Sequence, residues 1–181
     1  MRLLTFFLLT LLFACKNESN TPVQTTDIVA DAKEIDIEQE QNDDLKVYDY
    51  DGLKQFLSTD SEKTYIINFW ATWCAPCVKE LPYFEEMNSN YQERDVEVIL
   101  VSLDFPNKYD TSLKPFIKEK QLKSKVVALN DTNSNRWIQE ISKDWSGAIP
   151  ATLIFNKSKR QFYEQSFTYD ELENEVKQFL K

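Results

Sequence analysis

Two cysteines, Cys74 and Cys77, lie in the stretch NFWATWCAPCVKELPYF, residues 68–84, with two residues between them. Two thiols at this spacing can bind a metal, cross-link the chain, or exchange electrons as a dithiol and disulfide pair. A disulfide that closes so short a loop constrains little of the unfolded chain, so it adds little stability. Metal binding and redox chemistry remain as the two chemical interpretations.

Metal binding is limited by the composition of the chain. A structural zinc site uses four thiolate or imidazole ligands, but the chain has no histidine and only one further cysteine, Cys15. Two thiolates suit Cu(I), so a copper carrier stays open as an alternative. We expect no resident metal and no cofactor. The lack of histidine also excludes Ser-His-Asp and Cys-His catalysis, and two glycines are too few for a phosphate-binding loop.

The segments around the cysteines favour redox chemistry. Residues 65–70 are rich in β-branched and aromatic types, which predicts a buried strand, and residues 75–91 carry apolar side chains at spacings of three and four, which predicts a helix. The first turn of that helix favours a thiolate at Cys74, which we expect to be the exposed nucleophile. Cys77, partly covered, is then the resolving thiol. Pro76 is tolerated near a helix start.

The rest of the chain alternates strands and helices. This pattern predicts an α/β fold with a mainly parallel central sheet, helices on both faces and an antiparallel hairpin at one edge. Residues 65–102 are expected to form a β-α-β unit with parallel strands. The other expected strands are 46–48, 126–129, 151–155 and 161–165, and the other expected helices are 51–57, 112–120, 136–141 and 169–180.

The N-terminus has the composition of an export signal. Arg2 precedes an uncharged, mostly apolar run over residues 3–14. As a helix this run of about a dozen residues would span about 18 Å. A helix that crosses a bilayer requires roughly 20 residues, so the run is too short. Residues 12–15, LFAC, resemble the lipobox of bacterial lipoproteins, which implies a signal peptide over residues 1–14 and a lipid anchor on Cys15. An ordinary secretory signal or an uncleaved anchor is the alternative.

Acidic residues are concentrated before the expected domain. Residues 15–44 show no apolar periodicity, and between Asp27 and Asp44 eight acidic residues accompany one lysine. Such a segment is expected to be an extended, disordered tether. Residues 45–181, the expected folded domain, hold 21 acidic and 18 basic residues, so they account for little of the net charge of −9. Without a cluster of basic residues, nucleic acid is not an expected partner.

The sequence FWATWCAPC, residues 69–77, followed by Pro82, resembles the active site of the thioredoxin superfamily. The wider arrangement WCxPCxxExP is similar to the TlpA, ResA and CcmG group of membrane-tethered thiol-disulfide oxidoreductases. The resemblance covers roughly residues 45–181 and implies a thioredoxin-like fold, with Cys74 and Cys77 as the redox pair. It also implies that Trp73 and Pro76, next to the cysteines, contact the substrate.

The resemblance assigns a role to a distant segment, GAIPATLIF. Its Ile149 and Pro150 fall on the cis-proline of the family, which lies beside the cysteines and receives the substrate backbone. X-Pro bonds are the ones that adopt the cis form at low cost. A trans proline that starts a strand is the alternative. Trp145, just before this segment, is expected either to form a wall of the substrate groove or to pack in the core.

The resemblance also suggests a proton carrier. In thioredoxin itself a buried aspartate lies in the strand before the motif, whereas this chain has Asn68 at that position. The resemblance to the ResA group suggests that Glu80 takes over, and Glu80 can neighbour Cys77 because it lies three residues later on the same helix. Partial burial would raise the pKa of Glu80, which could then pass protons to and from Cys77. A solvated residue on the helix flank is the alternative.

The combined expectation is an exported thiol-disulfide oxidoreductase on the periplasmic side of the cell envelope, anchored by lipid at Cys15. The resemblance favours a disulfide reductase that acts on other exported proteins, cytochrome c maturation factors among the candidates, and is recharged by a membrane-bound electron donor. An oxidase or isomerase of the same fold is the nearest alternative, since the direction depends on reduction potential. A peroxidase resembling the peroxiredoxins and the copper carrier are the others.

Overall fold

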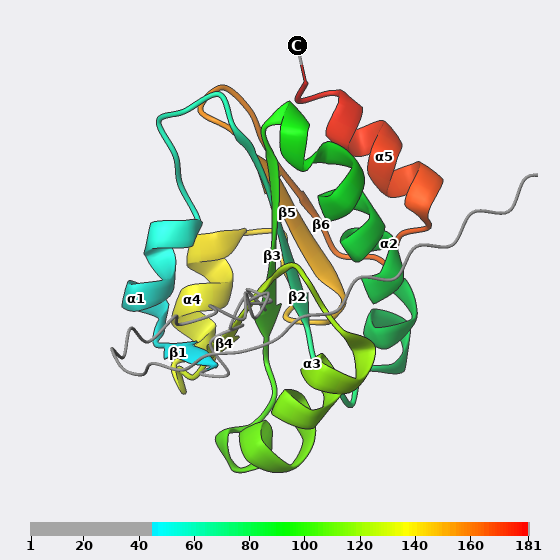
Figure 1. Ribbon diagram of the computed structural model, residues 1–181. Helices are drawn as coiled ribbons and strands as arrows, with labels where there is room; N and C mark the ends of the chain where they lie inside the picture. The colour runs from blue at the N-terminus through cyan, green and yellow to red at the C-terminus, as the bar shows by residue number, and fades with distance from the viewer. Residues whose placement is uncertain (1–44, 181) are drawn as a thin grey trace, which may run out of the picture. The chain divides into compact units, whose positions relative to one another are not determined.

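The computed structural model describes residues 45–180. The predicted signal peptide, the predicted lipidation site Cys15 and the predicted acidic tether lie outside the described residues. A single sheet of six strands forms the centre of the domain, in the order β1-β4-β3-β2-β5-β6 (Figure 1). The strands are β1 Lys46–Tyr48, β2 Thr64–Trp70, β3 Val96–Ser102, β4 Lys125–Leu129, β5 Ala151–Phe155 and β6 Arg160–Tyr163.

The pairing of the strands is mixed. β2, β3, β4 and β1 pair in parallel, and β5 and β6 run antiparallel to their neighbours β2 and β5. The β-α-β unit over residues 65–102 and the antiparallel hairpin at one edge are thus confirmed. The two central strands are almost fully buried, which is why both consist of β-branched and other apolar residues instead of alternating with polar ones.

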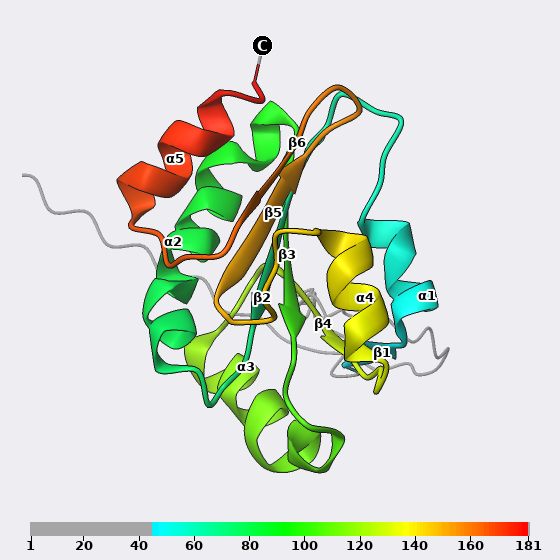
Figure 2. The ribbon, with the colours of Figure 1, turned by 180° about the vertical axis from the view of Figure 1, so that it is seen from behind.

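Helices cover both faces of the sheet. α2 Ala75–Tyr91 and α5 Tyr169–Lys177 lie side by side on one face, and α1 Tyr50–Leu53 and α4 Ser134–Ile141 lie on the other, as both views show (Figures 1 and 2). Successive strand residues point to opposite faces. Ile66 and Trp70 therefore join the core beneath α2, whereas Ile67 and Phe69 join the core beneath α4.

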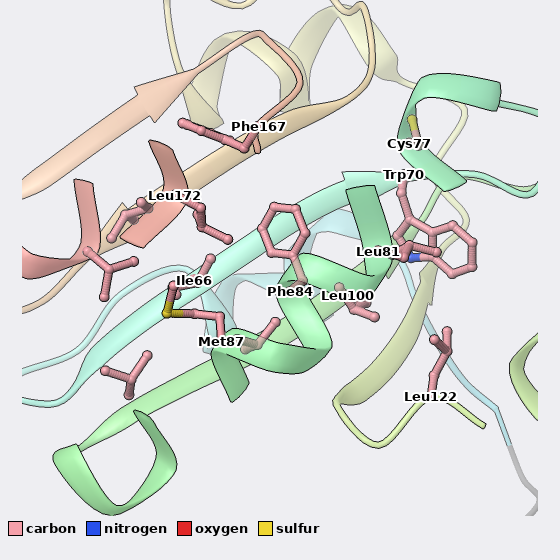
Figure 3. Close-up of a cluster of buried hydrophobic side chains, with 14 of the residues drawn as sticks. Ile66, Trp70, Cys77, Leu81, Phe84, Met87, Leu100, Leu122, Phe167 and Leu172 are labelled. Atoms are coloured by element: carbon pink, nitrogen blue, oxygen red, sulfur yellow. The ribbon is translucent and has the colours of Figure 1, made fainter. Parts of the chain in front are cut away.

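The face of α2 that meets the sheet differs slightly from the predicted one. Its buried residues are Cys77, Glu80, Leu81, Phe84, Met87 and Tyr91, while Val78, predicted on the buried stripe, is only half-buried. Phe84 and Met87 pack against Ile66 and Leu100 of the sheet (Figure 3). These apolar contacts fix the rotation of α2 about its axis. At this rotation Cys77 and Glu80 also face the sheet and are buried.

Several element boundaries differ from the predicted ones. α3 begins at Lys114 and ends at Lys120, because a π-helical turn over Tyr109–Leu113 precedes it. The final helix ends at Lys177 instead of residue 180, and Thr168 caps its start through the Glu171 backbone N–H. α1 is shorter than predicted and continues as a 3-10 turn over Lys54–Phe56. Within residues 45–180 no helix combines the length and apolar character needed to cross a membrane.

Candidate active site

Cys74 and Cys77 form a disulfide at the start of α2, with their Cα atoms 5.3 Å apart. Cys74 is the N-cap residue in extended conformation, and the Cys77 backbone N–H donates to Cys74 Sγ at 3.3 Å. This donor and the helix dipole both favour negative charge on Cys74 once the disulfide is reduced. Cys74 is 6% exposed and Cys77 is 0% exposed. The prediction of an exposed Cys74 is therefore too strong, since the residue as a whole is nearly buried.

The peptide bond between Ile149 and Pro150 is cis, as the family resemblance implied, and the trans alternative is wrong. Ile149 O lies 3.7 Å from Cys74 Sγ, so this loop and the disulfide are in contact. In the disulfide neither sulfur carries a proton, so this is a contact only. In the dithiol, the Cys74 S–H can donate to the same carbonyl oxygen.

Trp145 belongs to the core and does not form a groove wall. It is 2% exposed, its ring packs against Phe69 at 4.8 Å and Phe162 at 5.4 Å between centroids, and its Nε1–H donates to Ala148 O at 2.8 Å. The last contact ties the buried ring to the loop that leads to Pro150. Trp145 therefore positions that loop from below.

A carboxylate that the sequence reasoning missed holds the same loop from outside. Glu164, which follows β6, accepts hydrogen bonds from the backbone N–H of Ser146 at 3.0 Å and of Ala148 at 3.2 Å, and also from Ser146 Oγ. These hydrogen bonds, the Ser146 hydroxyl first, lower the pKa of Glu164 below its usual value. Between Ser146 and Ala148, Gly147 has a φ of +96°, a conformation that other residues rarely adopt.

Glu80 belongs to α2 and is buried on the face of this helix that meets the sheet. It is 2% exposed, and its two carboxylate oxygens accept hydrogen bonds from Asn68 Nδ2 at 3.0 Å and from the Phe167 backbone N–H at 2.8 Å. Burial raises the pKa of Glu80 to about 7, against the opposing effect of those two hydrogen bonds. The expectation of a buried carboxyl with a raised pKa is confirmed, and the alternative of a solvated side chain is wrong.

Asn68 can serve both protonation states of Glu80. Its Nδ2 donates to Glu80 Oε1 and also to Thr152 Oγ1 at 3.2 Å, while its Oδ1 has no hydrogen-bond partner among residues 45–180. Half a turn of the amide exchanges its oxygen and nitrogen, so Asn68 can donate to a carboxylate or accept from a protonated carboxyl. An aspartate at this position would instead place a second negative charge beside Glu80.

A second buried carboxylate, Asp104, fixes the loop that precedes Cys74. It is 2% exposed and accepts hydrogen bonds from the Thr72 backbone N–H at 3.0 Å, from Thr72 Oγ1 at 2.5 Å and from Ser102 Oγ at 2.9 Å. The sequence reasoning missed Asp104. The signal was available, because the ends of parallel neighbouring strands lie at one edge of the sheet and Asp104 follows β3 just as Thr72 follows β2.

The other predicted contact residues lie at the surface. Trp73 is 57% exposed, and Pro76, in the first turn of α2, is also exposed. In the part of the chain that the structure describes, no three Cys, Asp or Glu side chains gather closely enough to hold a metal ion. The soft ligands at the site are the two sulfurs of Cys74 and Cys77.

A disulfide at the start of the helix that follows a central strand, with a cis-proline against it, defines a thiol-disulfide oxidoreductase of the thioredoxin-like fold. A family model described as "AhpC/TSA family" matches residues 30–160. The chain belongs to this family.

Relatives of this chain carry the same activity in their names. A thiol-disulfide oxidoreductase ResA of Bacillus thuringiensis subsp. konkukian is 33% identical over 135 residues, which cover 75% of this chain and 72% of the relative. A ResA of Oceanobacillus iheyensis is 33% identical over 119 residues, 65% of this chain and 57% of the relative. The protein is therefore a protein thiol-disulfide oxidoreductase similar to ResA.

Solved structures agree on the fold. A thiol:disulfide interchange protein of Chlorobium tepidum TLS superposes with a TM-score of 0.56 at 19% identity, covering 73% of this chain and 90% of the other. StoA of Bacillus subtilis superposes with a TM-score of 0.52 at 22% identity, covering 65% and 84%. At these identities the likeness supports the thioredoxin-like fold and nothing more. The geometry of the disulfide described above is that of this chain itself.

Replacing Glu80 tests the protonation of the buried carboxyl. Because the pKa rises from 4.5 to about 7, the folded state keeps a proton that the unfolded state releases in this window. The free energy of unfolding should therefore fall as pH rises from about 4.5 to 7, by at most about 1.4 kcal/mol per pH unit from this group. Urea unfolding of Glu80→Gln should lack this contribution.

Glu86→Gln is the matched control, because Glu86 is exposed on the same helix. Its unfolding free energy should follow that of the wild type at every pH. Parallel pH profiles for the wild type and Glu80→Gln would contradict the assignment.

Proposed function

We propose that this protein is an exported, lipid-anchored reductase of disulfides in other proteins of the cell envelope. The observation that carries the direction is the surroundings of Cys74 Sγ. Besides its bond to Cys77 Sγ, this sulfur has two polar contacts. One is with a hydrogen-bond donor, the Cys77 backbone N–H, and the other is with a carbonyl oxygen, Ile149 O. A carbonyl oxygen opposes negative charge, and strongly oxidising pairs depend on a stabilised thiolate. The Ile149 oxygen therefore offsets part of the stabilisation that the helix dipole and the Cys77 N–H give to the thiolate, and a less stabilised thiolate favours the disulfide, so that the pair gives up electrons more readily.

The proposed reaction starts from the dithiol. The Cys74 thiolate attacks one sulfur of the substrate disulfide; a new S–S bond forms and the other substrate sulfur leaves as a thiolate, which takes up a proton. Cys77 then loses its proton and attacks Cys74 Sγ, which forms the Cys74–Cys77 disulfide and releases the second substrate sulfur. Two electrons pass from the protein to the substrate.

Glu80 is the proposed acceptor of the Cys77 proton. It lies three residues after Cys77 on the buried face of α2, and a pKa of about 7 lets it take up or release a proton near neutral pH. A carboxyl with an ordinary pKa would be ionised throughout and could not return the proton when the pair is reduced again. A membrane-bound donor is proposed to supply the two electrons for that reduction.

The location of the reaction is proposed from the N-terminal sequence. The apolar run of residues 3–14 and the lipobox-like sequence that ends at Cys15 support export and lipidation, and the acidic residues 27–44 support a tether between anchor and domain. Disulfides persist outside the reducing cytoplasm, so the periplasmic side of the envelope supplies suitable substrates. Cytochrome c maturation factors are proposed among them.

The reduction potential decides the direction. Full-length protein in detergent, equilibrated with thiol-disulfide buffers of graded composition, should titrate as one two-electron couple. A potential near or below about −220 mV is expected for a reductase, while one near about −120 mV would identify an oxidant. The fraction of disulfide at each buffer ratio is measured by thiol alkylation and mass spectrometry. Cys74→Ser should show no couple.

Trapping tests the roles of the two sulfurs. Because Cys77 is fully covered, Cys77→Ser should react with a disulfide-linked peptide through Cys74 and stop at the mixed disulfide. Mass spectrometry should find the added peptide on Cys74 of Cys77→Ser and none on Cys74→Ser. A stable adduct on Cys77 of Cys74→Ser, with none on Cys77→Ser, would reverse the two roles.

The anchor is tested by Cys15→Ala in a bacterial host that lipidates proteins. Loss of the lipid should move the protein from the membrane fraction to the soluble fraction, since one or two acyl chains supply the membrane affinity. Cys74→Ser should stay with the membrane as the matched control. An unmodified Cys15 in the N-terminal peptide of the wild type would refute lipidation.

A further inference from the structure

Two large aromatic side chains are exposed beside the disulfide. Trp73 is 57% exposed and Phe105 is 62% exposed, and Val47 is the third exposed large apolar residue in the part of the chain that the structure describes. The rings of Trp73 and Phe105 stack, with centroids 6.3 Å apart and planes at 21°. One ring belongs to the residue just before Cys74 and the other to the loop after β3. Together they form an apolar surface next to Cys74, the less buried of the two cysteines.

The rings are held in place by the hydrogen bonds beneath them. Asp104 accepts two hydrogen bonds from Thr72, at 3.0 Å from the backbone N–H and at 2.5 Å from Oγ1. Trp73 and Phe105 are the next residues of the two bonded loops, so the Thr72–Asp104 contact sets the separation of their backbones. Pro106 additionally restricts the backbone of Phe105 to the extended region, in which it is found.

A surface fixed in this way is suited to binding. Two apolar rings that are already ordered lose little conformational entropy when a partner covers them, and water leaves their faces. The Asp104 carboxylate is 2% exposed, so it adds almost no charged area to the surface that the two rings present. In a mixed disulfide the sulfur of the substrate cysteine is bonded to Sγ of Cys74, the residue next to Trp73, which brings the residues flanking the substrate cysteine close to this area.

We propose that Trp73 and Phe105 form a docking platform for an apolar side chain, aliphatic or aromatic, that flanks the reactive half-cystine of a protein substrate. Phe105 then determines specificity and does not take part in the sulfur chemistry. This inference rests on the disulfide exchange of the proposed function. It predicts selectivity among protein disulfides that have the same intrinsic reactivity.

The test uses pre-reduced full-length protein in detergent and two disulfide-linked peptide dimers that differ only at the residue after cysteine, phenylalanine or serine. The wild type should reduce the phenylalanine peptide faster. In Phe105→Ala the second-order rate constant for this peptide should fall about five- to tenfold, the effect of one aromatic contact. The rate for the serine peptide should stay the same, as should the reduction potential.

Matched variants separate docking from structure. Val47→Ala truncates another exposed apolar side chain, which lies on edge strand β1, and should change neither rate. Phe105→Tyr keeps the ring and should keep the preference for the phenylalanine peptide. Equal losses for both peptides, or no loss for either, in Phe105→Ala would overturn the docking platform. A wild type that reduces neither peptide would instead refute the proposed reductase.

Discussion

The parallel pairing of β2 with β3 determines where every group of the site lies. The two strands are in register from Thr64 with Val96 to Trp70 with Ser102, so they end side by side. The loop to Cys74 leaves from the end of β2, and the loop with Asp104 and Phe105 leaves from the end of β3. β5 runs the opposite way, and Ala151 at its start pairs with Phe69 near the end of β2. Pro150 thereby reaches the same edge of the sheet from a distant part of the chain.

The same arrangement explains the unusual burial of polar groups beneath α2. Asn68 and Thr152 face each other across β2 and β5 on the side that α2 covers, and the Asn68 amide bonds to both the Thr152 hydroxyl and the Glu80 carboxylate within an otherwise apolar core. The partners suffice to keep the carboxyl buried, but they do not replace the hydration that a charge loses. The free energies of the neutral and the charged form of Glu80 are therefore similar near neutral pH.

Much of the domain could be predicted from local sequence. The strand before the cysteines, the helix after them and the parallel return strand each follow from residue periodicity, while the placement of Pro150 beside the disulfide came from the resemblance to the thioredoxin superfamily. The predictions failed where distant contacts decide. Val78 was predicted on the buried face of α2, but the packing of Phe84 and Met87 against the sheet turns Glu80 inward instead. The contacts of Asp104 and Glu164 span 32 and 18 positions of the chain; the strand order could have pointed to Asp104, whereas Glu164 is an ordinary acidic residue in the sequence. Cys74 is 6% exposed and lies against the Ile149 carbonyl, a contact across 75 positions of the chain that no local pattern predicts.

The turn at Gly147 has a consequence for how this protein can vary. The chain contains two glycines, and Gly147 is the one with a positive φ, while a Cβ added there would lie 3.1 Å from Ile138 Cδ1. Any replacement is therefore strained twice, by the backbone angle and by a neighbour in α4. The loop that presents the Ile149 carbonyl to Cys74 is thus intolerant of mutation at a position that touches neither sulfur nor substrate. Natural selection would therefore retain glycine at this position because of the backbone angle and the neighbouring Ile138 side chain, and not because of any contact with the cysteines.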